Sequence, residues 1–145
     1  MEKKIDKEQS VIVIGHSLGG LVGSRLHTKG WKIDLLITVG SPLKGAAILK
    51  YFNQIIPKIM QKPFMTPVKK NLYRMIDDII DEPPHPYHCF TMSLPTSDNF
   101  DGCIFVNEAR FKDEHHTHLP YADHWLIFVN PRLLTRIDKK IKSKL

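Results

Sequence analysis

A chain of 145 residues has the length of one domain, and its hydrophobic fraction of 42% is sufficient to bury a core. No apolar run approaches the roughly 18 residues of a membrane-spanning helix, so the sequence predicts no transmembrane segment. The net charge of +6 would suit an anionic partner, but the basic C-terminal tail has no interleaved aromatic residues, and we expect a solvated helical face rather than nucleic-acid binding.

The first part of the chain reads as a strand, a helix and a second strand. The apolar run 11–14 predicts a buried parallel strand. Apolar residues at helical spacing predict a helix over 18–29, and Gly30 suits its C-terminal cap. A second apolar run, Ile33 to Val39, predicts the next strand, and Gly40-Ser41-Pro42 marks its end. Together these segments form one βαβ unit.

The turn between the first strand and the helix carries the sequence Gly15-His16-Ser17-Leu18-Gly19-Gly20. A G-x-S-x-G pattern between a strand and a helix is typical of a nucleophile elbow. We expect a side chain at Gly15 or Gly19 to collide with the neighbouring strand or helix, because the turn is tight. The turn also places the Ser17 hydroxyl at a helix N-terminus, where backbone N–H groups face developing negative charge. The alternative is a glycine-rich turn with an incidental serine.

On these residues the chain resembles the α/β-hydrolase fold, in its lipase and esterase branch. The resemblance implies that Ser17 is the nucleophile, that the N–H of Leu18 is an oxyanion donor, and that Gly19 and Gly20 allow a tight turn and close packing. In that family the elbow follows the fifth strand. The resemblance therefore covers only the second half of the fold, and 1–145 would be a single partial α/β-hydrolase domain with a parallel sheet and flanking helices.

Residues 46–82 carry two helical patterns, one from Ala46 to Met60 and one that begins at Thr66-Pro67. The resemblance implies that this insertion is a helical cap or lid over the site. The alternative is a pair of surface helices packed on the sheet.

The last part of the chain predicts two further strands and two helices. The strands are Tyr87 to Leu94 and Thr117 to Tyr121, and a short helix is expected over Val106 to Lys112. Asn130-Pro131 suits the start of a final helix. Its spacing predicts five inward-facing side chains: Leu133, Leu134, Ile137, Ile141 and Leu145. The two cysteines, Cys89 and Cys103, lack metal-type spacing and are expected as reduced thiols rather than as a disulfide.

A serine nucleophile needs a base, and the base needs an orienting carboxylate. Asp98 and Asp101 are the candidate acids, and the segment that begins Asp101-Gly102 is similar to the acid loop of the lipases, which favours Asp101. The segment around His124 resembles the histidine loop of the same family. His115, His116 and His118 are the other candidates for the base. A metal site at these three residues is the alternative to a loop of polar histidines beside the active site, and we expect no metal and no cofactor.

The resemblance therefore implies a serine carboxylic-ester hydrolase that acts on an acyl ester or lipid through Ser17, His124 and Asp101. We expect weak activity from this chain alone, because it supplies one oxyanion donor, Leu18, and leaves the edge of residues 11–14 unpaired. That edge suits a homodimer or a second polypeptide that completes the sheet. The alternative function is an inactive hydrolase remnant that serves as a protein-interaction module. Residues 1–10 are polar and do not form a secretory signal, so a chain complete as given is expected in the cytoplasm.

Overall fold

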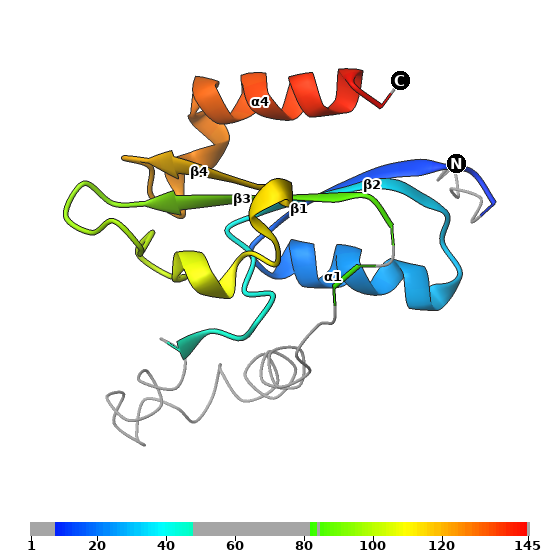
Figure 1. Cartoon of the computed structure of the whole chain (residues 1–145), viewed down its shortest axis with the longest axis horizontal. Coiled ribbons are helices and arrows are strands. Elements are labelled where there is room, and N and C mark those ends of the chain that lie inside the picture. The colour runs from blue at the N-terminus through cyan, green and yellow to red at the C-terminus, as the bar shows by residue number, and fades with distance from the viewer. Residues whose placement is uncertain (1–7, 48–81, 84, 145) are drawn as a thin grey trace, which may run out of the picture.

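The computed structural model describes residues 8–47, 82–83 and 85–144, and a parallel sheet lies at its centre (Figure 1). Four strands make up the sheet in this described part: β1 (Val11–His16), β2 (Ile33–Val39), β3 (Tyr87–Ser93) and β4 (His116–Pro120). They lie in the order β1-β2-β3-β4, and each neighbouring pair is parallel. The expected α/β class with a parallel sheet is confirmed.

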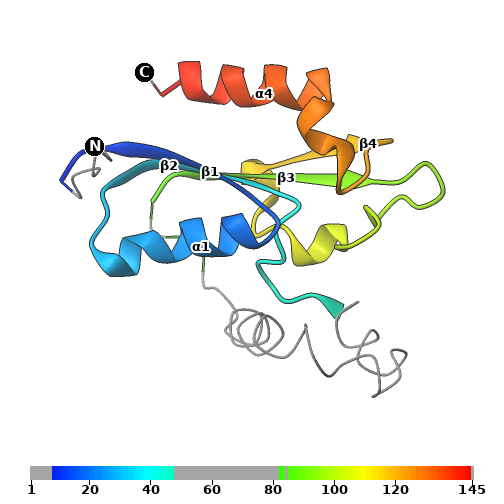
Figure 2. The same cartoon turned by 180° about the vertical axis from the view of Figure 1, so that it is seen from behind.

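Helices cover both faces of this sheet. Helix α1 (Leu18–Leu26) and the 3-10 turn η1 (His27–Lys29) connect β1 to β2, and α4 (Pro131–Lys142) follows the last strand. Figures 1 and 2 show α1 on one face and α4 on the opposite face. Short 3-10 turns lie between β3 and α4: η2 (Val106–Glu108), η3 (Asp113–His115) and η4 (Leu126–Val129). The cap and lid predicted over 46–82 lies almost entirely outside the described residues.

Local sequence signals place the ends of these helices. Gly30 adopts a left-handed conformation with φ 80°, and its N–H donates to the carbonyl of His27. Pro131 occupies the first turn of α4, and the side-chain oxygen of Asn130 accepts a hydrogen bond from the N–H of Arg132. The predicted start of the last helix is confirmed, whereas α1 ends at Leu26 and Gly30 caps the 3-10 turn η1 that continues it.

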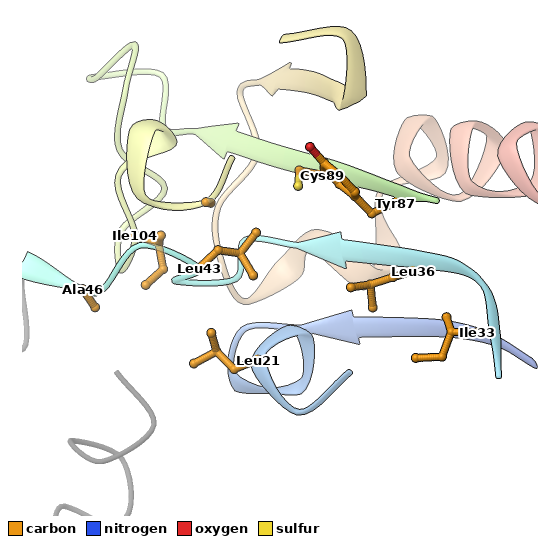
Figure 3. Packing of buried hydrophobic residues seen from close by; sticks show 9 residues of the cluster. Leu21, Ile33, Leu36, Leu43, Ala46, Tyr87, Cys89 and Ile104 are labelled. Carbon is orange, nitrogen blue, oxygen red and sulfur yellow. The ribbon is translucent and has the colours of Figure 1, made fainter. Parts of the chain in front are cut away.

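Two hydrophobic clusters hold the layers together, one on each face of the sheet. The cluster on the α1 face is shown in Figure 3 and includes Leu21, Ile33, Leu36, Leu43, Tyr87 and Cys89. The cluster on the α4 face includes Leu35, Ile37, Phe90, Met92, Ile127 and Leu133. Adjacent residues of β2, such as Leu36 and Ile37, belong to opposite clusters because successive strand side chains point to opposite faces.

The prediction of a buried strand over 11–14 is wrong in its burial. None of these four residues is buried, and Ile14 is 49% exposed. β1 lies at the end of the strand order, so within the described part of the chain it pairs with β2 only. This position agrees with the unpaired edge that the partial fold predicts.

Two further expectations need correction. Leu134 is 50% exposed instead of facing inward, because it lies roughly 100° around the helix from Leu133, which packs into the α4-face cluster. Leu145, also expected to face inward, lies outside the described residues. The helix expected over Val106 to Lys112 is only the 3-10 turn η2, which Glu108 holds by accepting a hydrogen bond from the N–H of Phe105. Cys89 and Cys103 are both free thiols, as expected. None of the helices in the described segments is long and apolar enough to cross a membrane.

Candidate active site

Ser17 lies in the turn between β1 and α1 and has an unusual backbone conformation. Its φ is 52° and its ψ is −123°, a region that residues other than glycine rarely adopt. Such strain persists only where the surrounding structure imposes it, and it is concentrated at functional sites. The Ser17 N–H donates to the carbonyl of Val39 at 2.9 Å, which ties the turn to the end of β2.

The glycines around Ser17 differ in how much space their neighbours leave for a side chain. A Cβ on Gly15 would lie 2.5 Å from backbone atoms of Gly19 and Gly20, so the start of α1 packs directly on the end of β1. A Cβ on Gly20 would collide with the side chain of Ser41, whose own Cβ would be 2.6 Å away.

The expected collision at Gly19 is not found. A Cβ there would meet no described atom within 4 Å, because Gly19 faces solvent on the first turn of α1. The close contact with Gly15 is made by the backbone atoms of Gly19. A side chain at position 19 would therefore not disturb it.

Leu18 is the first residue of α1, directly after Ser17. The first N–H groups of a helix have no intrahelical carbonyl to donate to, and the helix dipole favours negative charge there. The position suits a donor to an oxyanion, and the role of Leu18 stays a prediction.

Asp101 and His124 meet through a buried hydrogen bond. His124 Nδ1 lies 2.8 Å from Asp101 Oδ2, and both residues are buried, at 2% and 1% exposure. Asp101 Oδ1 accepts hydrogen bonds from the N–H groups of Cys103 at 2.8 Å and Ile104 at 2.7 Å. The His124 N–H donates to the carbonyl of Asp101 at 2.9 Å. The carboxylate is therefore held by its own loop and presents one oxygen to the imidazole.

The structure brings Asp101 to His124 and does not bring Asp98 there. Asp98 is exposed in the loop after β3, where its charge acts on His118. Asp101 instead begins the turn whose N–H groups bind its carboxylate.

Gly40 is a site residue that sequence reasoning used only to mark the end of a strand. It follows β2 with φ 51°, and its N–H donates to the carbonyl of Phe90 at 2.9 Å. A Cβ on Gly40 would lie 3.1 Å from Asp101 Oδ2 and 3.2 Å from His124 Nδ1. The Asp101–His124 pair thus rests against Gly40, next to Val39, which binds the Ser17 backbone. The signal was present in Gly40-Ser41-Pro42, but only the fold shows what approaches it.

Of the other candidate histidines, His115 ends the 3-10 turn η3, and the other two belong to the strand that follows it rather than to a loop. His116 and His118 lie on β4, where Thr91 Oγ1 is 2.7 Å from His116 Nε2 and 3.0 Å from His118 Nδ1. Ser93 Oγ is 3.1 Å from His118 Nε2. Burial lowers the pKa of both imidazoles because it disfavours their charged forms. In the described segments, no group of three metal-ligating side chains is present.

Exposed apolar side chains surround the loop that carries His124. Trp125 is 74% exposed, and its ring lies edge-on to the His124 ring at 5.5 Å between centroids. Leu126 and Val129 of η4 are 65% and 75% exposed. Leu126 and Val129, but not Trp125, line a shallow hollow of about 420 Å³ together with Tyr121 and Arg132.

Comparisons with known proteins bear on the fold and the family. The family model described as a PGAP1-like alpha/beta domain matches residues 1–77, which is more than half of the 145 residues. The chain is similar to the solved structure of a Bacillus licheniformis lipase, BlEst2 in its mature form, with a TM-score of 0.52 and 15% sequence identity. That likeness covers 87% of this chain and 66% of the lipase chain, so this chain spans just under two thirds of that neighbour. At this identity the likeness shows the fold. No curated protein sequence matches significantly.

Proposed function

This chain belongs to the PGAP1-like α/β domain family, and from that premise we propose that it is a serine carboxylic-ester hydrolase. Ser17 is the nucleophile, His124 the general base and Asp101 the residue that orients the imidazole. The observation that carries the proposal is the buried 2.8 Å hydrogen bond between His124 Nδ1 and Asp101 Oδ2. With Nδ1 bound to the carboxylate, Nε2 is the nitrogen left to accept a proton.

The reaction proceeds through an acyl-enzyme. Ser17 Oγ attacks the ester carbonyl carbon, and its proton passes to His124 Nε2. The N–H of Leu18 donates to the oxyanion that forms on the carbonyl oxygen. When the C–O bond breaks, the proton moves from His124 to the leaving alcohol. A water molecule then attacks the acyl group, with His124 again as base, and releases the acid and free Ser17.

The substrate class that suits this site is an acyl ester or a lipid. Exposed apolar side chains lie next to His124, in particular those of Trp125 and Leu126, and they favour a substrate with a hydrocarbon part. We expect weak activity from the described residues by themselves, because Leu18 is the one oxyanion donor identified among them, whereas the fold family uses two. The β1 edge also leaves the elbow strand paired on one side within the described residues.

A fluorophosphonate probe tests the proposal directly, because it reacts with an activated serine whatever the natural substrate is. We expect covalent labelling of the wild-type chain at Ser17, located by mass spectrometry of the digested protein. Ser17→Ala should abolish labelling, and Ser24→Ala, which alters a buried serine of α1 away from the elbow, should not. A wild-type chain that stays unlabelled at high probe concentration would contradict the proposal.

A second candidate function is favoured by the surface of the chain. The edge of β1 and the exposed side chains of Ile14, Phe128 and Val129 suit a protein partner, either a second copy or another polypeptide that completes the sheet. In that case the chain is an interaction module derived from a hydrolase. The same probe distinguishes the two functions, because an interaction module has no need of a reactive serine.

A further inference from the structure

His16, the residue directly before Ser17, contacts the histidine loop from the end of β1. Its Nε2 lies 3.0 Å from the backbone carbonyl oxygen of His124. A carbonyl oxygen only accepts hydrogen bonds, so the His16 Nε2 must carry the proton and donate it. In the neutral ring, Nδ1 is then the unprotonated nitrogen.

Ring contacts fix the orientation of His16. Its ring centroid lies 4.6 Å from that of His124, with 44° between the ring planes. The ring of Phe128 of η4 also packs edge-on against it, at 4.7 Å between ring centroids. Contacts with two rings and one hydrogen bond restrict the rotation of this half-buried side chain, so its Nε2 points in a defined direction, toward the His124 carbonyl.

The other bonds that hold His124 come from one loop. Its Nδ1 and its backbone N–H both bind Asp101, which lies after β3. These two bonds fix the position of His124 relative to Asp101, and neither of them reaches β1. The bond from His16 supplies that link, because Ser17 is the next residue along the chain.

We propose that His16 is a positioning residue, whose Nε2–H bond to the His124 carbonyl sets the place of the base relative to the nucleophile Ser17. This inference rests on the proposed function and deepens it. Displacing a reacting group by about 1 Å costs on the order of 10²-fold in rate, so a bond that sets this distance matters to the chemistry.

The electrostatics around His16 agree with a neutral donor. Burial lowers the pKa of His16, and the neighbouring His124 lowers it further, while the bond to the His124 carbonyl and the charge of Asp101 act in the opposite direction. A neutral ring does not oppose the imidazolium that forms on His124 during the reaction, whereas a protonated ring beside it would.

Three substitutions of His16 separate the hydrogen bond from the packing. In His16→Gln the amide nitrogen occupies the place of Nε2 and keeps the donor. In His16→Asn the shorter side chain does not reach the carbonyl, and His16→Phe keeps a ring without a donor. His27→Asn is the matched control, because His27 is exposed on η1. Circular dichroism verifies that each variant is folded, and the Gln and Asn pair decides the question if the Phe variant does not fold.

The first readout is the second-order rate of fluorophosphonate labelling at Ser17. We expect His16→Asn and His16→Phe to react roughly tenfold more slowly than wild type, as the loss of one hydrogen bond predicts. His16→Gln should stay within about threefold of wild type and His27→Asn should be unchanged. Equal rates for the Gln and Asn variants, or a wild-type rate in the Asn variant, would overturn the proposal.

The second readout does not depend on a reactive serine. Nuclear magnetic resonance measures the solvent exchange of the His124 Nδ1–H proton, which the bond to Asp101 protects. Without its bond to His16 the histidine loop is less constrained, so the bond between His124 and Asp101 should open more often. We therefore expect exchange on the order of tenfold faster in His16→Asn than in wild type or His16→Gln. Unchanged exchange in His16→Asn would overturn the positioning role. If exchange changes as expected but wild-type Ser17 is never labelled, the proposed function fails while the positioning of His124 by His16 stands.

Discussion

Alanine at Gly15 and at Gly19 should have opposite effects on stability, although both glycines belong to the same short motif. In Gly15→Ala the new Cβ would lie 2.5 Å from backbone atoms of Gly19 and Gly20, whereas ordinary contacts begin at 3.4 Å. The start of α1 would have to retreat by roughly 0.9 Å, the difference between these distances. Overpacking of this kind costs about 1–3 kcal/mol, and rigid backbone atoms place the cost near the upper value.

Gly19→Ala has no such cost. A Cβ there meets no described atom within 4 Å, and Gly19 lies in the first turn of α1. Alanine in a helix is favoured over glycine by roughly 0.5–1 kcal/mol, because glycine loses more backbone entropy on folding. The two variants should therefore differ in their free energy of unfolding by about 4 kcal/mol.

Urea denaturation at 25 °C, followed by tryptophan fluorescence, measures this difference. The same two variants should be compared in fluorophosphonate labelling, where Gly15→Ala should be slow because the turn that carries Ser17 is displaced, and Gly19→Ala should react close to the wild-type rate. A Gly19→Ala variant destabilised by more than about 1 kcal/mol would refute the reasoning. So would a Gly15→Ala variant as stable as wild type, because the contact between β1 and α1 would then not be as tight as described.

Three further predictions concern the acid, the pH dependence and the sheet edge. Asp101→Asn should slow labelling of Ser17 by roughly 10³–10⁴-fold, while Asp98→Asn should leave it within about twofold; equal effects would show that Asp101 does not orient the base. Burial and the charge of Lys140 lower the pKa of His88 to about 4. Below about pH 6.5 His88 therefore takes up a proton in the unfolded chain but not in the folded chain, and it should contribute about 2 kcal/mol to the fall in the free energy of unfolding between pH 7 and pH 5. In His88→Gln the fall should be smaller by about this amount but not absent, because the pKa values of His16, His116 and His118 are also lowered. Urea titrations of both proteins at both pH values check it, and an equal fall in both would contradict the assignment. We expect self-association through the edge of β1, measured by sedimentation velocity. Ile14→Lys should prevent it, whereas Val22→Lys should not, because Val22 has the same 49% exposure but lies on α1. A wild-type chain that stays monomeric at high concentration would contradict this prediction.

Much of the local structure follows from short-range patterns. The apolar run Ile33–Val39 coincides with β2, because a run of that length between turn residues favours a buried strand. Gly30 and Asn130-Pro131 mark helix ends because their backbone preferences act on neighbouring residues alone. The order of Ser17, Asp101 and His124 along the chain, together with the sequences around them, was enough to nominate a site.

The remaining features required the tertiary structure, because they depend on which distant residues meet. In the sequence, Asp101 is favoured over Asp98 only through its similarity to the acid loop of the lipases. The structure adds the physical reason, which is the turn that binds the Asp101 carboxylate and directs it to His124. In the sequence, Gly40 only marks the end of a strand. The structure shows that the acid and the histidine pack against it. The exposure of Ile14 reflects the place of β1 at the end of the strand order, which no pattern within the strand records. Backbone conformation is a local property that a few neighbouring residues determine, whereas burial and contact depend on the packing of segments that are far apart in the chain.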